Sequence, residues 1–339
     1  MQRINILDIK PHVVSKSLKG YSVLFYGPPK CGKTTISSQF PKALLLAFEK
    51  GYNALPGVMA ADITSWADFK YILTQLKSKE AHEMYSTIII DTADIAYSLC
   101  EKYVCSNAVI KKNGSEQIGV DNVADIPFGK GYGMVENEFD NTLRMITQLN
   151  YGLVIISHEQ TRKLVDENGE EYGQLICPTL DKRSAKIVNR LVDLLGYAKP
   201  VTDAEGNTST KLLLRGNEKY IAGSRFKHTP TYIDFDYETL VDTIAKAAEA
   251  AGNDVGKEFI TEEYIENTEP ADAALDFDKL METFNSIANK RLENAENKEH
   301  EASIITEIVE KFIGRGNKVN DMSRHQVDTL SLIVDALSE

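Results

Sequence analysis

The sequence predicts an α/β fold with a mostly parallel central sheet, an antiparallel edge and a small helical region at the C-terminus. Four nearly continuous apolar runs support the parallel sheet, at residues 21–26, 43–48, 87–91 and 152–157. Strands that are buried on both faces of a parallel sheet have such sequences. Helical patterns separate these runs, and alternating strands and helices are typical of an open, doubly wound sheet.

The other elements follow from local patterns. Three further strands have no helix between them, which indicates an antiparallel or hairpin edge: 191–198, 210–215 and 219–224. Helical patterns lie at 33–40, 66–78, 92–106, 134–149 and 180–190. Two long irregular stretches, 107–131 and 159–179, interrupt the alternation. Loops of this length in a compact domain are usually functional or disordered.

The last third of the chain differs in charge. Residues 231–339 hold 25 acidic and 10 basic residues, so the net charge of −12 belongs mostly to this part and the front carries a small positive excess. We expect an ATPase core at 1–235, a helix and acidic linker at 236–275, and a small helical domain or oligomerisation element at 276–339. The acidic tail could mimic nucleic acid, recruit a basic partner or act as a solubilising extension.

Composition excludes several classes of protein. No window approaches the roughly 18 uninterrupted apolar residues of a membrane span, and the first residues have no apolar core of a secretion signal. The cysteines are too few and too scattered for a disulfide framework or a zinc site: Cys31, Cys100, Cys105 and Cys177. We therefore expect a cytoplasmic protein without a membrane partner.

The segment GPPKCGKTT predicts a nucleotide site. Residues 27–34 fit G-x-x-x-x-G-K-[ST], between a predicted strand and a predicted helix. Backbone N–H groups of such a loop bind phosphates, Lys33 neutralises the β- and γ-phosphates, and Thr34 ligates Mg²⁺. The alternative is a chance Gly-rich turn. The expected ATP-binding residues are Gly27, Pro28, Pro29, Lys30, Cys31, Gly32, Lys33, Thr34 and Thr35.

Asp91 ends the run TIIID. An aspartate at the carboxyl end of a buried parallel strand lies at the edge of the sheet where ligands bind. We expect it to hold Mg²⁺ together with Thr34, usually through water. The alternative is that Asp91 caps the helix that follows.

Other sequence signatures limit the class of P-loop NTPase that the sequence fits. A GTPase needs N-K-x-D after a strand, and the nearest match, residues 317–320, lies in the helical tail and ends in Asn. A transport ATPase needs an LSGGQ-like signature, which is absent from the sequence. Helicases and AAA+ machines usually place Glu directly after the strand-end Asp, where this chain has Thr92. The acid that activates water must therefore come from elsewhere.

Glu49 is the candidate for that acid, because it leaves a strand that we expect beside the P-loop strand. The alternative is a solvated turn residue paired with Lys50. His158 ends the run VIIS, a place that resembles the strand end where RecA-like ATPases carry a polar γ-phosphate sensor; Gln160 is the competitor and simple strand capping the alternative. Arg225 resembles the second cation of the K-x-R pattern by which RecA-like ATPases reach a neighbouring subunit's nucleotide, and a surface arginine on a hairpin is the alternative.

Together these motifs resemble the phage-encoded RecA-like ATP-binding proteins of the recombination and single-strand-annealing group. The resemblance covers roughly residues 15–235. It is carried by GPPKCGKTT at 27–35, LLLAFEKGYNAL at 44–55, TIIIDT at 87–92, FGKGYG at 128–133, VIISHEQ at 154–160 and AGSRF at 222–226. It implies a RecA-like P-loop NTPase that forms a ring or filament, with Lys33, Glu49, Asp91, His158 and Arg225 as catalytic residues. In this family the strand-end residue is commonly Gln, and of the K-x-R pattern only Arg225 is present, with Gly223 in place of the first cation.

The resemblance also implies that two loops bind single-stranded DNA, at 107–131 and 159–179. Cations that neutralise phosphates and aromatics that stack on bases suit that ligand. Acidic residues share these loops, so plain solvated loops are the alternative. Phe128 and Tyr132 could stack on bases, and the expected DNA-binding residues are Lys111, Lys112, Lys130, Arg162 and Lys163.

The leading hypothesis is a Mg²⁺-dependent, DNA-stimulated ATPase that acts on single-stranded DNA in phage-type recombination, annealing or replication, in the host cytoplasm if phage-encoded. A nucleotide-gated loader or interaction protein, whose acidic tail recruits a single-strand-binding or replication protein, is the alternative. A small-molecule kinase is less favoured, because the sequence has no evident Arg-rich lid.

Overall fold

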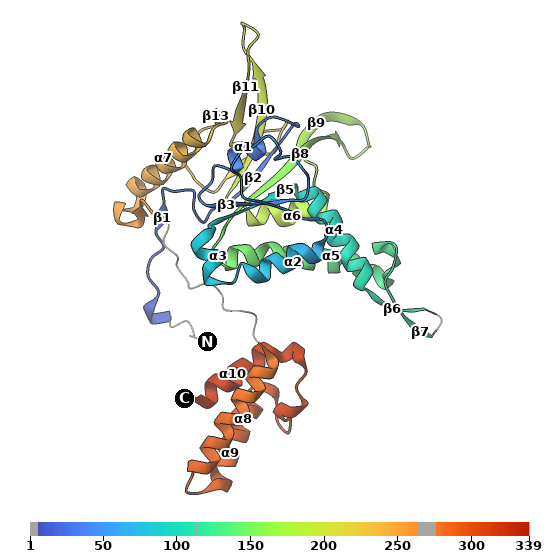
Figure 1. Cartoon of the computed structure of the whole chain (residues 1–339), viewed down its shortest axis with the longest axis vertical. Coiled ribbons are helices and arrows are strands. Elements are labelled where there is room, and N and C mark those ends of the chain that lie inside the picture. Colours follow the sequence, from blue (N-terminus) through green and yellow to red (C-terminus); the bar gives the residue numbers. More distant parts are fainter. Residues whose placement is uncertain (1–5, 113, 264–275, 339) are drawn as a thin grey trace. The chain divides into compact units, whose positions relative to one another are not determined.

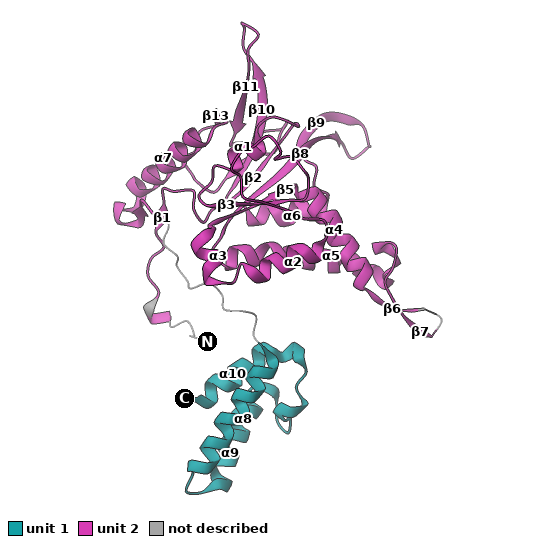
Figure 2. Ribbon diagram, viewed as in Figure 1, with its two compact units in different colours: residues 1, 271–339 teal, residues 2–270 magenta. Residues whose placement is uncertain are grey.

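The computed structural model describes residues 6–112, 114–263 and 276–338. They form two compact units, residues 2–270 and residues 271–339, which are described separately (Figure 2). The first unit contains the predicted strands. Part of the expected acidic linker, residues 264–275, lies outside the described residues.

The first unit is built on a mostly parallel sheet with an antiparallel edge, which confirms the predicted fold class (Figure 1). Its strands follow the order β13-β11-β10-β2-β8-β5-β3-β4. The parallel strands are β2 (Ser22–Gly27), β3 (Ala43–Ala47), β4 (Ala60–Asp62), β5 (Thr87–Asp91), β8 (Gly152–Val165) and β10 (Leu194–Thr202). The antiparallel edge consists of β11 (Thr208–Leu213), β12 (Gly223–Ser224) and β13 (Tyr232–Asp234).

The strand order corrects one expectation. The strand that precedes Glu49, β3, is not the neighbour of the P-loop strand β2, because β8 and β5 lie between them. Local sequence pattern does not encode strand order, since each of these strands is a similar apolar run. Crossover connections determine the order instead.

Three hairpins replace segments that the sequence predicts as loops or as a strand. β8 continues beyond the sheet and pairs with β9 (Glu171–Pro178), so much of 159–179 is a projecting hairpin (Figure 1). β6 (Val109–Lys112) and β7 (Ser115–Ile118) form a second hairpin within 107–131, and β10 and β11 extend as a third. In the expected strand 219–224 only β12 forms, because the Asn217 side chain accepts from the backbone N–H groups of Lys219 and Tyr220 in a turn.

Helices cover both faces of the sheet (Figure 1). One face carries α2 (Trp66–Gln75), α4 (Ala93–Asn107), α5 (Lys130–Gln148) and α6 (Lys182–Leu191), and α3 (Lys79–Met84) lies near its edge. The other carries α1 (Lys33–Ser37) and α7 (Tyr237–Val255). Side-chain oxygens begin several of these helices by accepting backbone N–H bonds, from Ser65, Ser78, Asp181 and Asp236.

Two apolar clusters hold the layers together. Ile88, Phe139 and Trp66 belong to the cluster on the α2–α4–α5–α6 face, and Phe25 and Ile244 to the cluster on the α1–α7 face. Fully burying a large apolar side chain contributes about 1.5–3 kcal/mol. The sheet strands contribute alternate residues to both clusters, so the carboxyl ends of the strands are held in fixed positions.

The second unit is a bundle of α8 (Phe277–Asn294), α9 (Lys298–Ile313) and α10 (Val327–Ser338), which confirms the expected helical region. Its core lies around Val309, Leu330 and Ile333. Arg291 joins the helices, donating to Glu301 at 2.6 Å and to the carbonyl of Leu337 at 2.9 Å. No helix in the described part of the chain is long and apolar enough to cross a membrane.

Candidate nucleotide-binding site

The phosphate-binding loop joins the end of β2 to the start of α1. A Cβ atom on Gly27 would lie 2.5 Å from the carbonyl oxygen of Ala198 on β10, so only glycine fits beside that strand. Gly32 has φ 96°, a left-handed conformation that favours glycine, and directly precedes α1. The chain therefore turns into the helix with its first backbone N–H groups facing the loop.

Lys33 is enclosed by this loop. Its side chain is 5% exposed, and its ammonium donates to the carbonyls of Gly27 at 2.9 Å and Pro28 at 2.8 Å. It also lies 3.7 Å from the Cys31 sulfur. Burial raises the pKa of the Cys31 thiol despite the nearby ammonium, so Cys31 is a neutral side chain in the loop. The ammonium therefore lies at the centre of the loop, where phosphate oxygens could replace the carbonyls as acceptors.

Asp91 faces Thr34 across the site. The Thr34 hydroxyl donates to the Asp91 carboxylate at 2.7 Å, and the N-cap position of α4 belongs to Thr92. Burial raises the pKa of Asp91; the bond from Thr34 opposes this, and the charge of Glu49 adds to it. A divalent cation would relieve the repulsion between these carboxylates, so the donor set fits Mg²⁺.

The protein oxygens at this site are suited to a metal ion that also binds the phosphates of a nucleotide. Among the described residues no group of three or more His, Cys, Asp or Glu side chains could hold a metal ion. Mg²⁺ usually binds through one or two protein oxygens together with substrate phosphates and water. The Thr34 hydroxyl and Asp91 carboxylate are a donor set of that kind.

Glu49 and His158 complete the cluster from two other strands. The backbone N–H groups of Phe48 and Glu49 donate to the Asp91 carbonyl, at 2.7 and 3.0 Å, which places Glu49 beside Asp91. His158 is paired in register with Gly27, and its Nε2 lies 3.3 Å from a Glu49 carboxylate oxygen. Lys50 does not pair with Glu49; it lies 3.4 Å from Asp62.

Comparison with known proteins agrees with this geometry. A family model described as AAA domain matches residues 19–226, more than half of the chain. The chain belongs to the AAA domain family. A "SPbeta prophage-derived uncharacterized protein YorG" of Bacillus subtilis (strain 168) is 32% identical over 345 residues, covering 99% of this chain and 98% of the relative. The predicted phage-type AAA/P-loop ATPase is thereby confirmed.

A solved structure also matches this AAA domain protein. The flagellar accessory protein FlaH from Methanocaldococcus jannaschii is 13% identical, with a TM-score of 0.31, over 64% of this chain and 85% of that chain. Membership of the AAA domain family rests on the sequence matches. With the loop geometry, it supports nucleotide binding and an ATPase.

Arg225 lies away from the cluster in this AAA domain. It follows β12, which pairs with the start of β10, whereas the P-loop follows the end of the parallel neighbour β2. Its guanidinium pairs with Asp193 at 2.8 Å and donates to the carbonyl of Arg190 at 2.6 Å. The structure thus brings together Lys33, Thr34, Asp91, Glu49 and His158, and separates Arg225 from its own nucleotide loop.

The predicted DNA-binding residues lie on the hairpins and at the start of α5. Arg162 on β8 donates to the carbonyl of Leu180, and Lys163 pairs with Glu171 across the hairpin at 2.7 Å. Lys111 lies opposite Glu116 in the β6–β7 register. Lys130 is the first residue of α5, and the side chain of Lys112 lies outside what the structure describes.

The sequence patterns did not reveal two other features. One is the network that fixes His158: the backbone N–H and hydroxyl of Thr179 both donate to the His158 carbonyl, at 2.9 and 3.0 Å. Gln160 turns away to the carbonyls of Pro178 and Leu180. These contacts join the start of the β8–β9 hairpin to His158, and only the hairpin pairing brings the two segments together.

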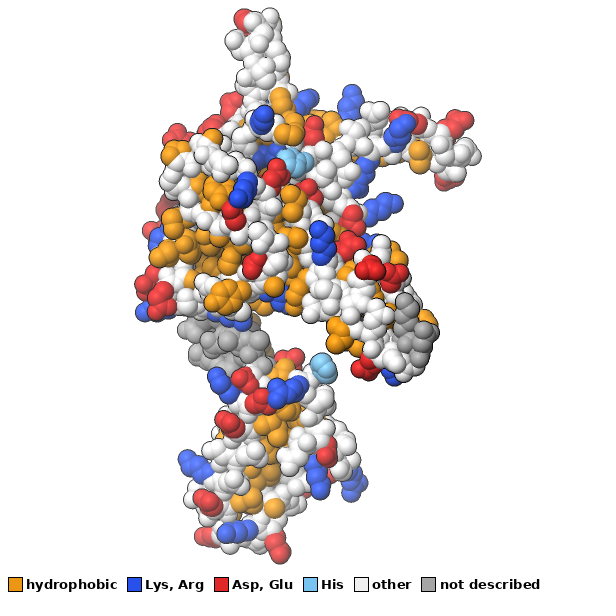
Figure 3. Space-filling view, turned by 45° about the vertical axis from the view of Figure 1, so that its right-hand side comes forward, with side chains coloured by type: hydrophobic (Ala, Val, Ile, Leu, Met, Phe, Trp, Pro, Cys, Tyr) orange, Lys and Arg blue, Asp and Glu red, His pale blue; other side chains and the backbone are white. Residues whose placement is uncertain are grey.

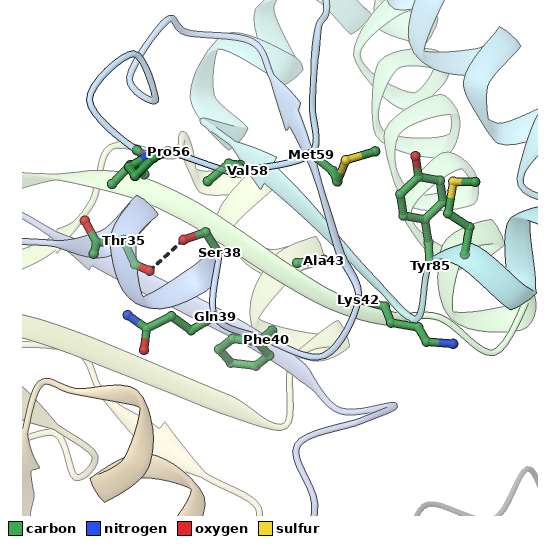
Figure 4. A pocket seen from close by; sticks show the side chains of 13 residues that line it. Thr35, Ser38, Gln39, Phe40, Lys42, Ala43, Pro56, Val58, Met59 and Tyr85 are labelled. Carbon is green, nitrogen blue, oxygen red and sulfur yellow. Dashed lines mark hydrogen bonds between the residues drawn. The ribbon is translucent and has the colours of Figure 1, made fainter.

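The other is a cavity of about 710 Å³ beside the P-loop helix (Figure 4). It begins at Thr35 and Ser38 and extends to Lys42 and Tyr85. Its opposite wall is the segment between Glu49 and β4, residues 55–59. Thr35 belongs to the predicted phosphate loop, whereas Lys42 and Tyr85 precede β3 and β5, so the cavity extends from the P-loop helix toward the opposite edge of the sheet.

Proposed function

We propose that the chain is a Mg²⁺-dependent ATPase that binds single-stranded DNA in phage-type recombination, annealing or replication, and that hydrolyses ATP at sites between subunits. The observation that carries the proposal is the convergence of five side chains from four segments at one edge of the sheet: Lys33, Thr34, Glu49, Asp91 and His158. One of these segments, β8, continues from His158 into a projecting hairpin.

The roles follow from this geometry. Lys33 and the loop N–H groups bind the phosphates and stabilise the charge that develops during transfer. Thr34 and Asp91 would hold Mg²⁺, which would supply further charge neutralisation at the phosphates. Glu49 orients a water for attack on the γ-phosphorus and accepts its proton as the bond to ADP breaks, giving ADP and phosphate. His158 holds the Glu49 carboxylate in place.

The subunit contact is part of the proposal. We propose that the chain assembles into a ring or filament and that Arg225 approaches the nucleotide of a neighbouring copy. Its side chain is more than half exposed, so a neighbour can reach it. An approaching phosphate would compete with Asp193 for the guanidinium, and this exchange would couple hydrolysis to assembly.

The loader function remains the second candidate. No residue of α8 is buried, although its apolar side chains pack against the small core of the helical unit. An apolar strip on this unit is visible in Figure 3, where charged side chains lie around it. Such a surface could receive a single-strand-binding or replication protein. Turnover that rises with such a partner and not with DNA would favour this function.

We expect ATP turnover to rise when single-stranded DNA is added at low salt. Charge reversal at Lys111 and Lys112, or at Arg162 and Lys163, should abolish the rise and leave turnover without DNA largely unchanged, because these residues lie outside the nucleotide cluster. The measurement is steady-state phosphate release with and without oligo-dT.

The control is Lys79→Glu with Lys102→Glu, two exposed positions on α3 and α4. Circular dichroism checks that Arg162→Glu, which loses the bond to Leu180, preserves the fold. Turnover that is indifferent to DNA at low salt would remove single-stranded DNA from the proposal.

A further inference from the structure

Helix α6 has an apolar inner face and a strongly basic outer face. Ser184, Ile187 and Val188 are buried against the sheet. Its outer positions carry exposed cations at helical spacing, together with the neutral Asn189: Lys182, Arg183, Lys186 and Arg190. Residues four apart lie on one side of a helix, so Lys182, Lys186 and Arg190 form a row along the α6 axis.

The structure shows no carboxylate of the described residues paired with the cations of this row. Among the residues that the structure describes, no acidic side chain forms an ion pair with Lys182, Lys186 or Arg190. The acids around α6 are engaged elsewhere: Asp181 caps the helix, Glu136 on α5 pairs with Arg183 at 2.8 Å, and Asp193 pairs with Arg225.

The cations of the α6 row differ in this respect from the cations on the β8–β9 hairpin. Lys163 is already paired with Glu171, and Arg162 is bonded to the Leu180 carbonyl. A phosphate that binds Lys163 must compete with a carboxylate, whereas no carboxylate of the described residues is paired with Lys186. The α6 row is therefore better suited to polyanion binding than the hairpin strands.

Aromatic side chains lie at the N-terminal end of the row. The Arg183 guanidinium lies 4.2 Å from the centre of the Tyr132 ring, on the neighbouring helix α5. Phe128 precedes α5 and is 95% exposed, with a left-handed backbone at φ 62°. A row of cations beside exposed rings suits a single strand, because the cations bind its backbone and the rings stack on its bases.

The spacing of the cations also fits a strand. Four helical residues rise about 6 Å, so the three cations span about 12 Å along the axis. Nucleotides of one strand in a duplex are about 3.4 Å apart, and those of a more extended single strand lie further apart, so the row covers at most about three steps.

We infer that the basic face of α6, with Tyr132 and Phe128 at its end, is a backbone-binding track for single-stranded DNA. The inference rests on the proposed function and adds a site to it. Lys182, Lys186 and Arg190 bind backbone phosphates, and the two rings stack on bases.

The test is the salt dependence of oligo-dT binding, measured by fluorescence anisotropy with the full chain. Each phosphate contact contributes about 0.7 to the slope of log K against log salt for single strands. Combining Lys182→Gln, Lys186→Gln and Arg190→Gln should lower the slope by about 2, and Lys186→Gln alone by about 0.7. Phe128→Ala should weaken binding roughly tenfold without changing the slope.

The matched control removes three exposed helical cations elsewhere, by Lys79→Gln, Lys102→Gln and Lys246→Gln, and should leave the slope unchanged. Nucleotide binding reports folding of each variant. If wild-type turnover responds to DNA while the α6 variants keep the wild-type slope, the track is refuted and the proposed function stands. If the wild type binds no oligo-dT at low salt, or binds only anionic vesicles, both the α6 track and the proposed function are refuted.

Discussion

Replacing Lys33 with alanine should abolish ATP hydrolysis and weaken nucleotide binding strongly. The Lys33 ammonium lies at the centre of the loop and donates to the Gly27 and Pro28 carbonyls, and we expect phosphate oxygens to replace these acceptors. Removing one preorganised charge-stabilising group from a water-poor site typically costs about 100- to 1,000-fold in rate. We expect at least this loss in kcat/KM, measured as phosphate release over a range of ATP concentrations.

The matched control is Lys102→Ala, on α4. Lys102 is exposed, so its removal changes the net charge equally without altering the loop. Its turnover should stay within a few-fold of the wild type. Hydrolysis by Lys33→Ala at the level of Lys102→Ala would show that the phosphates bind elsewhere.

Glu49→Gln should separate binding from hydrolysis. Glutamine keeps the size of the side chain and can still bond to His158, but it cannot accept a proton from water. General-base catalysis contributes about 100- to 10,000-fold, so kcat should fall by that factor while the affinity for ATP is retained. Single-turnover hydrolysis and equilibrium binding of a fluorescent ATP analogue measure the two quantities.

Glu83→Gln, an exposed carboxylate on α3, is the control for a general effect of charge. This variant should leave kcat and the affinity for ATP unchanged. If Glu49→Gln hydrolyses ATP at the wild-type rate, another group orients the water, and the contact between Glu49 and His158 has only a structural role.

Features encoded in short segments could be predicted from sequence. The P-loop follows from eight consecutive residues, and the buried strands follow from runs such as 87–91. The positions of Asp91 and His158 follow as well, because the carboxyl ends of parallel strands meet at one edge of the sheet. Long, strongly patterned elements leave few alternatives, and the C-terminal helices belong to this group.

Features that depend on pairing between distant segments could not be predicted. Residues 159–179 contain polar and Gly residues that are typical of a loop, yet β8 continues through them because β9 folds back on it. The strand order that separates β3 from β2 is also invisible in any one segment. The basic face of α6 is encoded at helical spacing, but its significance depends on which carboxylates the fold brings near.

Arg225 illustrates the same limit. A motif placed it in a neighbour's site, and the structure shows it paired with Asp193 beside the end of α6. Its proposed contact with a neighbour's nucleotide depends on assembly and is therefore not encoded in its local sequence.

The most direct measurement is a structure of the Glu49→Gln variant with Mg²⁺ and ATP. We predict that the Lys33 ammonium leaves the Gly27 and Pro28 carbonyls for the β- and γ-phosphates, that Thr34 and Asp91 lie at the metal, and that residue 49 faces the γ-phosphate. A nucleotide bound outside the 27–35 loop, or residue 49 directed away from the γ-phosphate, would contradict the proposed site.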